Sequence, residues 1–144
     1  ISHDMMTGFP SESERDHQDT LSLMEEVKYD FGYMFAYSER PGTYAARHFE
    51  DDISPDIKQR RLEEIITLQQ RHSLGRNKRF LNQECSVLID KSSKKSNEFW
   101  SGRTSENNVV VFPKYEFSLG EIVNVQVNDC TTATLIGDII KVKA

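Results

Sequence analysis

The sequence lacks the features that mark several classes of protein. Its 144 residues contain two cysteines, Cys85 and Cys130, with no Cys-x-x-Cys spacing, which excludes a disulfide framework and a cysteine zinc site. We expect both to be buried thiols in a reducing cytoplasm. No apolar run reaches the roughly 18 residues of a membrane span, and no signal-peptide segment is visible. The four histidines show no ligand spacing, so we assign no metal or catalytic residue.

Charge is unevenly distributed along the chain. The net charge is −5, with 28% charged and 37% hydrophobic residues, which allows a packed core. Residues 1–74 hold 8 Lys/Arg and 15 Asp/Glu, whereas residues 75–144 hold 10 and 8. Only the second half has a charge that would not repel a phosphate backbone. The asymmetry predicts two domains with different roles.

The first half alternates strand-like and helix-like segments. Residues 1–9 predict a short buried strand ending in a Gly-Phe-Pro turn, and Ser11 or Ser13 can cap the helix that follows. A second strand is expected over residues 31–37 and a loop over 38–43. Ser54-Pro55 then starts a helix that fades near residues 74–75.

This last helix predicts one buried stripe and one solvated face. The stripe consists of Ile57, Leu62, Ile65, Ile66 and Gln69. The face expected to be solvated consists of Lys58, Arg60, Arg61, Glu63, Glu64 and Gln70.

The second half predicts a small all-β barrel. Short β-branched runs at residues 85–89, 109–112, 122–127 and 133–136 are separated by Ser/Lys/Asn/Gly stretches. Two βα units cannot close a barrel alone, so residues 1–75 are expected to be the C-terminal part of a larger α/β barrel. Residues 76–144 are expected to be a complete OB-like barrel. The start at Ile1 rather than Met also predicts a fragment.

Four motifs, in order, resemble the radical-SAM methylthiotransferase family. They are Ser-His-Asp-Met-Met-Thr-Gly-Phe-Pro-Ser-Glu-Ser at residues 2–13, Tyr-Ser-Glu-Arg-Pro-Gly-Thr-Tyr-Ala at 37–45, Arg-Leu with Leu-Gln at 61–69, and Gly-Arg-Thr with Val-Phe-Pro and Thr-Thr-Ala-Thr-Leu-Ile-Gly at 102–137. The last resembles the family's TRAM domain. The Arg-Pro pair at 40–41 is similar to the sequence at this place in the branch of the family that modifies tRNA.

The resemblance implies a parent enzyme with two 4Fe-4S clusters and S-adenosylmethionine that adds a methylthio group to isopentenyl-adenosine beside the anticodon. Its partner is then the anticodon stem-loop of tRNA, and the parent is expected to be a cytoplasmic monomer. Two alternatives remain. One is a fragment of the branch that modifies an aspartate of a ribosomal protein, and the other is a non-catalytic TRAM module that binds RNA.

Three departures from the family pattern stand out. Ser11 replaces a usual Gly, which predicts an altered turn, and His3 replaces a common Thr. The Cys-x-x-x-Cys-x-x-Cys run that holds the radical-SAM cluster is absent, and no other residue type replaces thiolate ligands there. The chain by itself is therefore expected to be inactive.

The resemblance implies that five residues line the S-adenosylmethionine pocket: Gly8, Pro10, Glu12, Tyr37 and Arg40. They lie where two predicted barrel strands end, the edge at which α/β barrels place their sites. Arg40 can fork onto a carboxylate. The alternatives are an ordinary strand-to-helix turn, with Glu12 favouring the helix dipole, and a structural ion pair of Arg40.

Residues of the second domain are candidates for binding RNA. Cations on barrel loops suit phosphate contacts, and Trp100 can stack on an unpaired base. The alternatives are that the cations only keep the surface solvated and that Trp100 belongs to the core. The candidates are Arg76, Lys78, Arg79, Lys94, Trp100, Arg103, Thr104 and Asn107, with Lys91 and Lys95 beside them.

Overall fold

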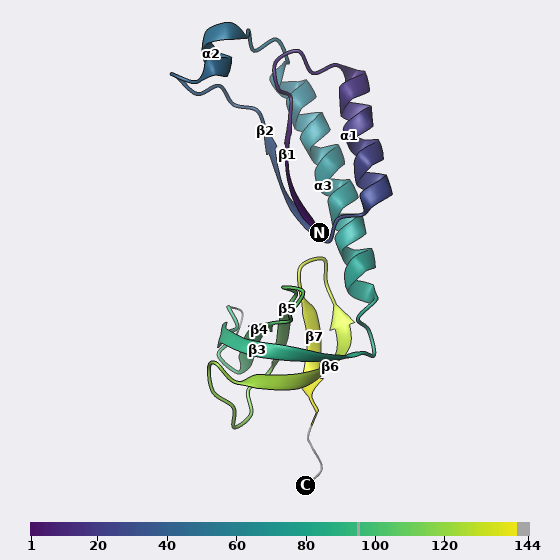
Figure 1. Ribbon diagram of the computed structural model, residues 1–144, viewed down its shortest axis with the longest axis vertical. Coiled ribbons are helices and arrows are strands. Elements are labelled where there is room, and N and C mark those ends of the chain that lie inside the picture. The colour runs from purple at the N-terminus through teal and green to yellow at the C-terminus, as the bar shows by residue number, and fades with distance from the viewer. Residues whose placement is uncertain (95, 141–144) are drawn as a thin grey trace. The chain divides into compact units, whose positions relative to one another are not determined.

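The computed structural model describes residues 1–94 and 96–140, which form two compact units (Figure 1). Unit 1 comprises Ile1–Ser73 and unit 2 begins at Leu74. The helix α3, Pro55–Lys78, contains the division between them. It extends past residues 74–75, where the sequence predicted that it fades. No helix of the described residues is long and apolar enough to cross a membrane.

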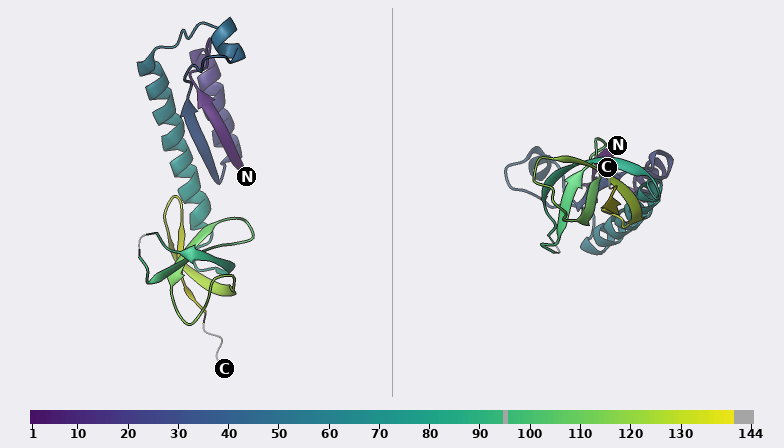
Figure 2. Two further views of the ribbon diagram at one scale, coloured as in Figure 1. Left: turned by 90° about the vertical axis from the view of Figure 1, so that its left-hand side faces the viewer. Right: turned by 90° about the horizontal axis from the view of Figure 1, so that it is seen from below.

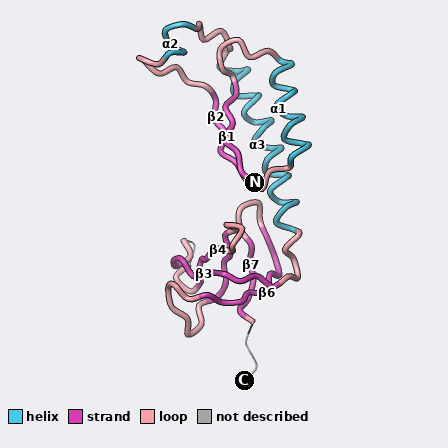
Figure 3. Tube along the Cα trace, in the orientation of Figure 1, coloured by secondary structure: helices cyan, strands magenta, loops and turns pink. Residues whose placement is uncertain are grey.

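Unit 1 is a β-α-β arrangement followed by two helices (Figure 3). The strands β1, Ser2–Thr7, and β2, Phe31–Ala36, pair in parallel across α1, Glu14–Val27. Ser13 caps α1 in a capping box with Asp16, as the sequence predicted, because each side chain bonds the other's backbone N–H. A short helix that the sequence did not predict, α2 at Tyr44–His48, precedes α3.

The two-stranded sheet is covered on one face only. Helices α1 and α3 lie against the side that carries Met5 and Met34 (Figure 1). The other side leaves Met6, Tyr33 and Phe35 exposed. The prediction of a buried strand over residues 1–9 was therefore wrong for one face, because alternate residues of a strand point to opposite sides.

The charged face of α3 is also not solvated throughout. Arg61 is 4% exposed and Lys58 is 8% exposed, whereas Ile57, predicted to be buried, is 39% exposed. Ion pairs with acids outside the helix compensate the burial of both cations. Ile65 and Gln69 are buried as predicted.

Unit 2 contains a closed five-stranded barrel in the order β3-β4-β5-β7-β6 (Figure 2). Its strands are β3, Glu84–Ser92; β4, Phe99–Arg103; β5, Val109–Pro113; β6, Ile122–Cys130; and β7, Leu135–Ile139. The core consists of inward-facing aliphatic residues and Phe112. The predicted small barrel is confirmed, while β4 was missed because Ser-Gly-Arg is typical of a loop. Residues 141–144, which the predicted second domain included, lie outside the described residues.

Gly102 is required by a close approach between strands. A Cβ there would lie 2.4 Å from the backbone oxygen of Leu88, whereas a Cβ on Gly75 in α3 would meet nothing within 4 Å. We expect Gly102→Ala to destabilise the barrel by roughly 1–3 kcal/mol, because the backbone must move. Urea unfolding followed by the fluorescence of Trp100, the one tryptophan of the chain, measures this. Gly75→Ala is the control and is expected to cause no loss; equal effects would contradict the prediction.

Candidate functional site

The carboxyl ends of β1 and β2 bring together the residues predicted to line a cofactor pocket. Gly8 and Pro10 are buried and Tyr37 is 9% exposed, while Arg40 is exposed. Phe9 packs edge-on against Tyr37, with ring centroids 5.2 Å apart. Three of the five predicted residues are thus buried, and Arg40 lies in the loop that follows β2.

Glu12 is the centre of a polar cluster rather than a free carboxylate. Its Oε1 accepts hydrogen bonds from Gly8 N at 3.0 Å and Thr7 Oγ1 at 3.2 Å. Arg61 Nη1 donates to the same oxygen at 2.6 Å and to the backbone oxygen of Glu12 at 3.0 Å. Glu12 therefore fixes the turn after β1 to α3, a pairing that no motif or periodicity predicted.

A second buried cation, Lys58, packs against the same strand ends. Its Nζ lies 2.6 Å from both carboxylate oxygens of Asp51 and 5.2 Å from the centre of the Tyr37 ring. Its side chain fills the space that a Cβ on Gly8 would need, and Gly8 has a φ of +73°. The sequence missed Lys58 and Asp51 because helix periodicity placed Lys58 on the solvated face.

Ser11 keeps the left-handed turn that glycine would favour. Its φ is 71°, and its backbone N–H donates to Asp52 Oδ1 at 2.8 Å. This hydrogen bond offsets the cost of a positive φ in a residue with a Cβ, so serine adopts here a conformation that glycine would favour. The other departure, His3, faces α3 and contacts Gln69 Oε1 at 2.8 Å.

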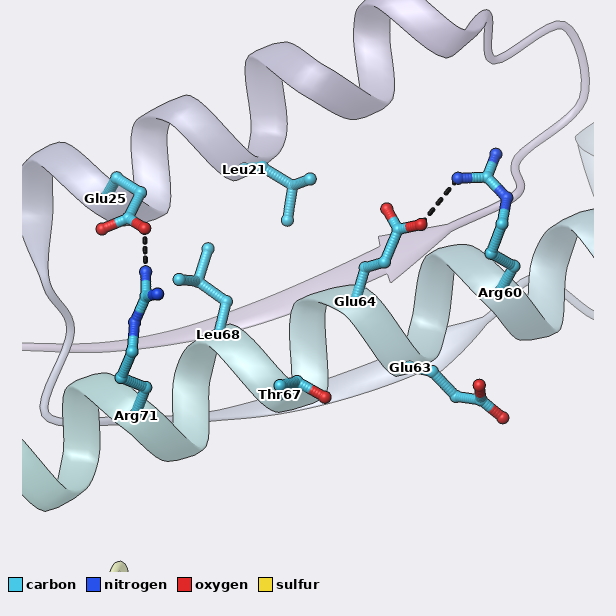
Figure 4. A pocket seen from close by; sticks show the side chains of 8 residues that line it. All are labelled: Leu21, Glu25, Arg60, Glu63, Glu64, Thr67, Leu68 and Arg71. Carbon is cyan, nitrogen blue, oxygen red and sulfur yellow. Dashed lines mark hydrogen bonds and ion pairs between the residues drawn. The ribbon is translucent and has the colours of Figure 1, made fainter.

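Helices α1 and α3 form an open groove of about 470 Å³ that is separate from the strand ends (Figure 4). Leu21 and Leu68 lie in it, and ion pairs of Glu64 with Arg60 and of Glu25 with Arg71 border it. Buried His17 lies 2.7 Å from Glu64 Oε2.

In unit 2, Arg103 and Asn107 are joined by hydrogen bonds across the turn between β4 and β5. Arg103 Nη1 donates to Asn107 O at 3.1 Å and to Asn107 Oδ1 at 2.9 Å. Asn107 adopts a φ of 69°, which asparagine tolerates. Thr104 is buried, and its hydroxyl accepts a hydrogen bond from Asn108 N at 3.2 Å. Thr104 and Asn107 therefore shape the turn that presents the Arg103 side chain.

Trp100 is half-buried at the edge of the barrel core. It is paired with buried Phe112 in the register of β4 and β5 and packs against the core. Lys114 Nζ lies 4.1 Å from the centre of its ring and donates to Ser92 Oγ. The geometry favours the core interpretation of this side chain over base stacking.

The remaining predicted RNA-binding cations are dispersed. Lys78 and Arg79 are exposed where α3 ends, and Arg76 is half-buried beside them. Lys94 is exposed between β3 and β4, far along the chain from that group. Lys95 lies outside the described residues. No group of three or more His, Cys, Asp or Glu side chains in the described part of the chain is arranged to hold a metal ion.

Comparisons with known proteins identify relatives of both units. Residues 78–140 match the TRAM domain family. The chain is 59% identical over 138 residues to a tRNA-2-methylthio-N(6)-dimethylallyladenosine synthase of Christiangramia forsetii and 55% identical to that of Flavobacterium psychrophilum. Each match covers 96% of this chain and 29% of the relative. They confirm the resemblance to the tRNA-modifying methylthiotransferases, of which the chain spans less than a third.

We expect Glu12→Gln to destabilise unit 1 by about 3 kcal/mol, because Arg61 would keep its buried charge without a carboxylate at Oε1. Urea unfolding followed by far-UV circular dichroism at pH 7 measures the change. Glu14→Gln is the control, since Glu14 also pairs with Arg61 but is 52% exposed. A loss for Glu14→Gln as large as that for Glu12→Gln would contradict the role of burial.

The ion pairs of α1 and α3 predict a loss of stability in acid. Arg60 lowers the pKa of Glu14 from 4.5 to about 2, and His17 lowers the pKa of Glu64. Because these folded-state pKa values lie below the unfolded value, their contribution is present above pH 4.5 and is lost as the pH falls toward 2.

Helix content followed by circular dichroism between pH 7 and pH 2 tests this dependence. Glu64→Gln is expected to lower stability at pH 7 and to flatten the profile. Glu63→Gln is the control, because Glu63 points away from α1 (Figure 4) and bonds Gln59. Identical profiles for the two variants would contradict the assignment.

Proposed function

We propose that this chain, a relative of the tRNA-2-methylthio-N(6)-dimethylallyladenosine synthases, is the part of such an enzyme that binds the tRNA. The similarity over 96% of the chain, with a TRAM match over the barrel, carries the proposal. The parent protein then adds a methylthio group to isopentenyl-adenosine next to the anticodon, and the anticodon stem-loop is the RNA that unit 2 contacts.

Unit 1 is proposed to be the end of a radical-SAM α/β barrel. Its parallel strands carry both helices on one face, as the outer layer of such a barrel requires. The bare face, with Met6, Tyr33 and Phe35 exposed, would then point toward the barrel interior. Further strands of the parent protein would cover it.

S-adenosylmethionine is proposed to lie against the carboxyl ends of β1 and β2. Arg40 is exposed there and suits a carboxylate, since a guanidinium forks onto two oxygens. Gly8, Pro10, Glu12 and Tyr37 are proposed to shape the wall, with Glu12 acting through the turn that it holds. When bound, the cofactor and its cluster supply the radical chemistry, and this chain positions the substrate.

The chain does not offer the ligands of a 4Fe-4S cluster. Cys85 and Cys130 both lie in strands of the barrel, and burial raises the pKa of the Cys85 thiol, which disfavours the thiolate that iron needs. We therefore assign both clusters to the remainder of the parent protein, since the chain covers 29% of its relatives.

Arg103 is proposed to be the main phosphate contact, assisted by Arg76, Lys78, Arg79 and Lys94. Its side chain is exposed and already oriented by Asn107, so little conformational freedom is lost when RNA binds. Thr104 and Asn107 are proposed to act by shaping the turn that presents Arg103, and Trp100 by packing against the barrel core rather than by contacting RNA.

Binding of the chain to an anticodon stem-loop across a salt series tests the proposal. We expect binding that weakens with salt, and Arg103→Ala is expected to lower the affinity and to reduce the slope of log K against log salt by about 0.7. Arg15→Ala, an exposed arginine of unit 1, is the control and should leave both unchanged. If the folded barrel does not bind the RNA at low salt, the proposed RNA binding is wrong, and the branch that modifies a ribosomal protein is favoured.

A further inference from the structure

We propose that the outer face of β6, β3 and β4 carries a binding strip for single-stranded RNA, formed by Ile122, Leu88 and Arg103. The proposal rests on the tRNA-binding function proposed above and adds the apolar part of the contact. Neither aliphatic residue was among the candidates that the sequence offered for binding RNA.

The register of the barrel places the three side chains in one row. β3 lies between β4 and β6 in the closed barrel (Figure 1). Leu88 is the Cα partner of Ile122 on one side and of Arg103 on the other. Directly opposed residues have Cβ atoms roughly 5 Å apart, so neighbouring members of the row can contact the same ligand.

The two aliphatic residues are far more exposed than the barrel requires. Leu88 is 48% exposed and Ile122 is 70% exposed, while their neighbours Val87 and Val123 are buried in the core. The next outward pair along β3 and β6 is Ser86 and Asn124, both exposed and polar. An apolar pair therefore interrupts a polar outer face, which costs solvation unless a partner covers it.

Arg103 gives the strip a cationic end. Asn107 holds one of its nitrogens, and within the described part of the chain no carboxylate lies within ion-pair distance of Arg103. Three acids lie close in sequence to residues of the strip, and each has a contact of its own. Asp90 lies 3.6 Å from Lys91 Nζ, Glu106 accepts a hydrogen bond from Ser105 Oγ, and Glu121 accepts one from Ser118 N.

This combination fits an unpaired nucleotide better than a duplex. Leu88 and Ile122 present only apolar atoms, which pack on the face of a base or on a ribose and make no hydrogen bonds to base edges. In a duplex the base faces are covered by stacking, whereas in a loop they are open. Arg103 at the end of the row would bind a phosphate of the same strand, so charge complementarity favours RNA over an apolar protein segment.

Substitution of the strip by threonine tests the proposal without removing strand propensity. Leu88→Thr and Ile122→Thr are each expected to weaken binding of the chain to the anticodon stem-loop by roughly three- to tenfold, because apolar area is no longer covered. The loss should be the same at low and high salt, in contrast to Arg103→Ala. Leu23→Gln is the control, since Leu23 is 47% exposed on α1 of the other unit. Loop positions carrying 4-thiouridine should cross-link to the peptides that contain Leu88 or Ile122.

Each outcome separates the strip from the function on which it rests. If the unsubstituted chain binds no RNA, the proposed function fails and the strip fails with it. If it binds and the threonine variants bind equally well, with cross-links elsewhere, only the strip is overturned. If sedimentation shows that the unsubstituted chain is an oligomer and the threonine variants are monomers, while RNA binding is unchanged, the row is a protein contact and the proposal is wrong. The fluorescence of Trp100 verifies that each variant has a folded barrel.

Discussion

The carboxylate of Glu12 determines much of the local structure of unit 1, because Arg61 is buried and needs a partner. Removing a guanidinium from water is costly, and only a close, well-bonded carboxylate offsets that cost. Glu12 supplies it while also accepting hydrogen bonds from Gly8 N and Thr7 Oγ1, so one group joins the end of β1, the start of α1 and the second turn of α3. The strand ends at which α/β barrels place their ligands are therefore held by an ion pair.

The sequence predicted those elements whose causes are local. A capping Ser13 before α1 and the short aliphatic runs of the barrel depend on neighbouring residues, and their structures were confirmed. The burial of Lys58 and Arg61 could not be predicted in this way, because their partners, Asp51 and Glu12, are brought close only by the fold. Helix periodicity records where apolar side chains lie and carries no information on a charge that is neutralised by a distant segment.

The candidate sites show the same division. The candidate residues at the strand ends and Arg103 were chosen from motifs, which depend only on neighbouring residues. Trp100 was predicted to contact RNA and β4 to be a loop, because Phe-Trp-Ser-Gly-Arg alternates poorly between apolar and polar residues. In the closed barrel, Gly102 permits the close approach to β3, and the register pairs Trp100 with Phe112. The outward row of Leu88 and Ile122 could not be predicted from the sequence for a related reason. Alternation of apolar and polar residues distinguishes the two faces of one strand, whereas only the pairing of strands shows which residues of neighbouring strands lie on the same face.

Bulk charge cannot supply the RNA affinity that we propose for this chain. Residues 75–144 hold 10 cations against 8 acids, and the preceding half carries a net charge of −7. A long-range field of that size steers a polyanion weakly, so binding must depend on a few oriented contacts. A guanidinium already fixed by a backbone turn meets that requirement with a small entropic cost. In the proposed strip, the exposed aliphatic side chains beside it would add a contribution that salt does not screen. A chain with an excess of acidic residues would then bind an anionic partner at physiological ionic strength.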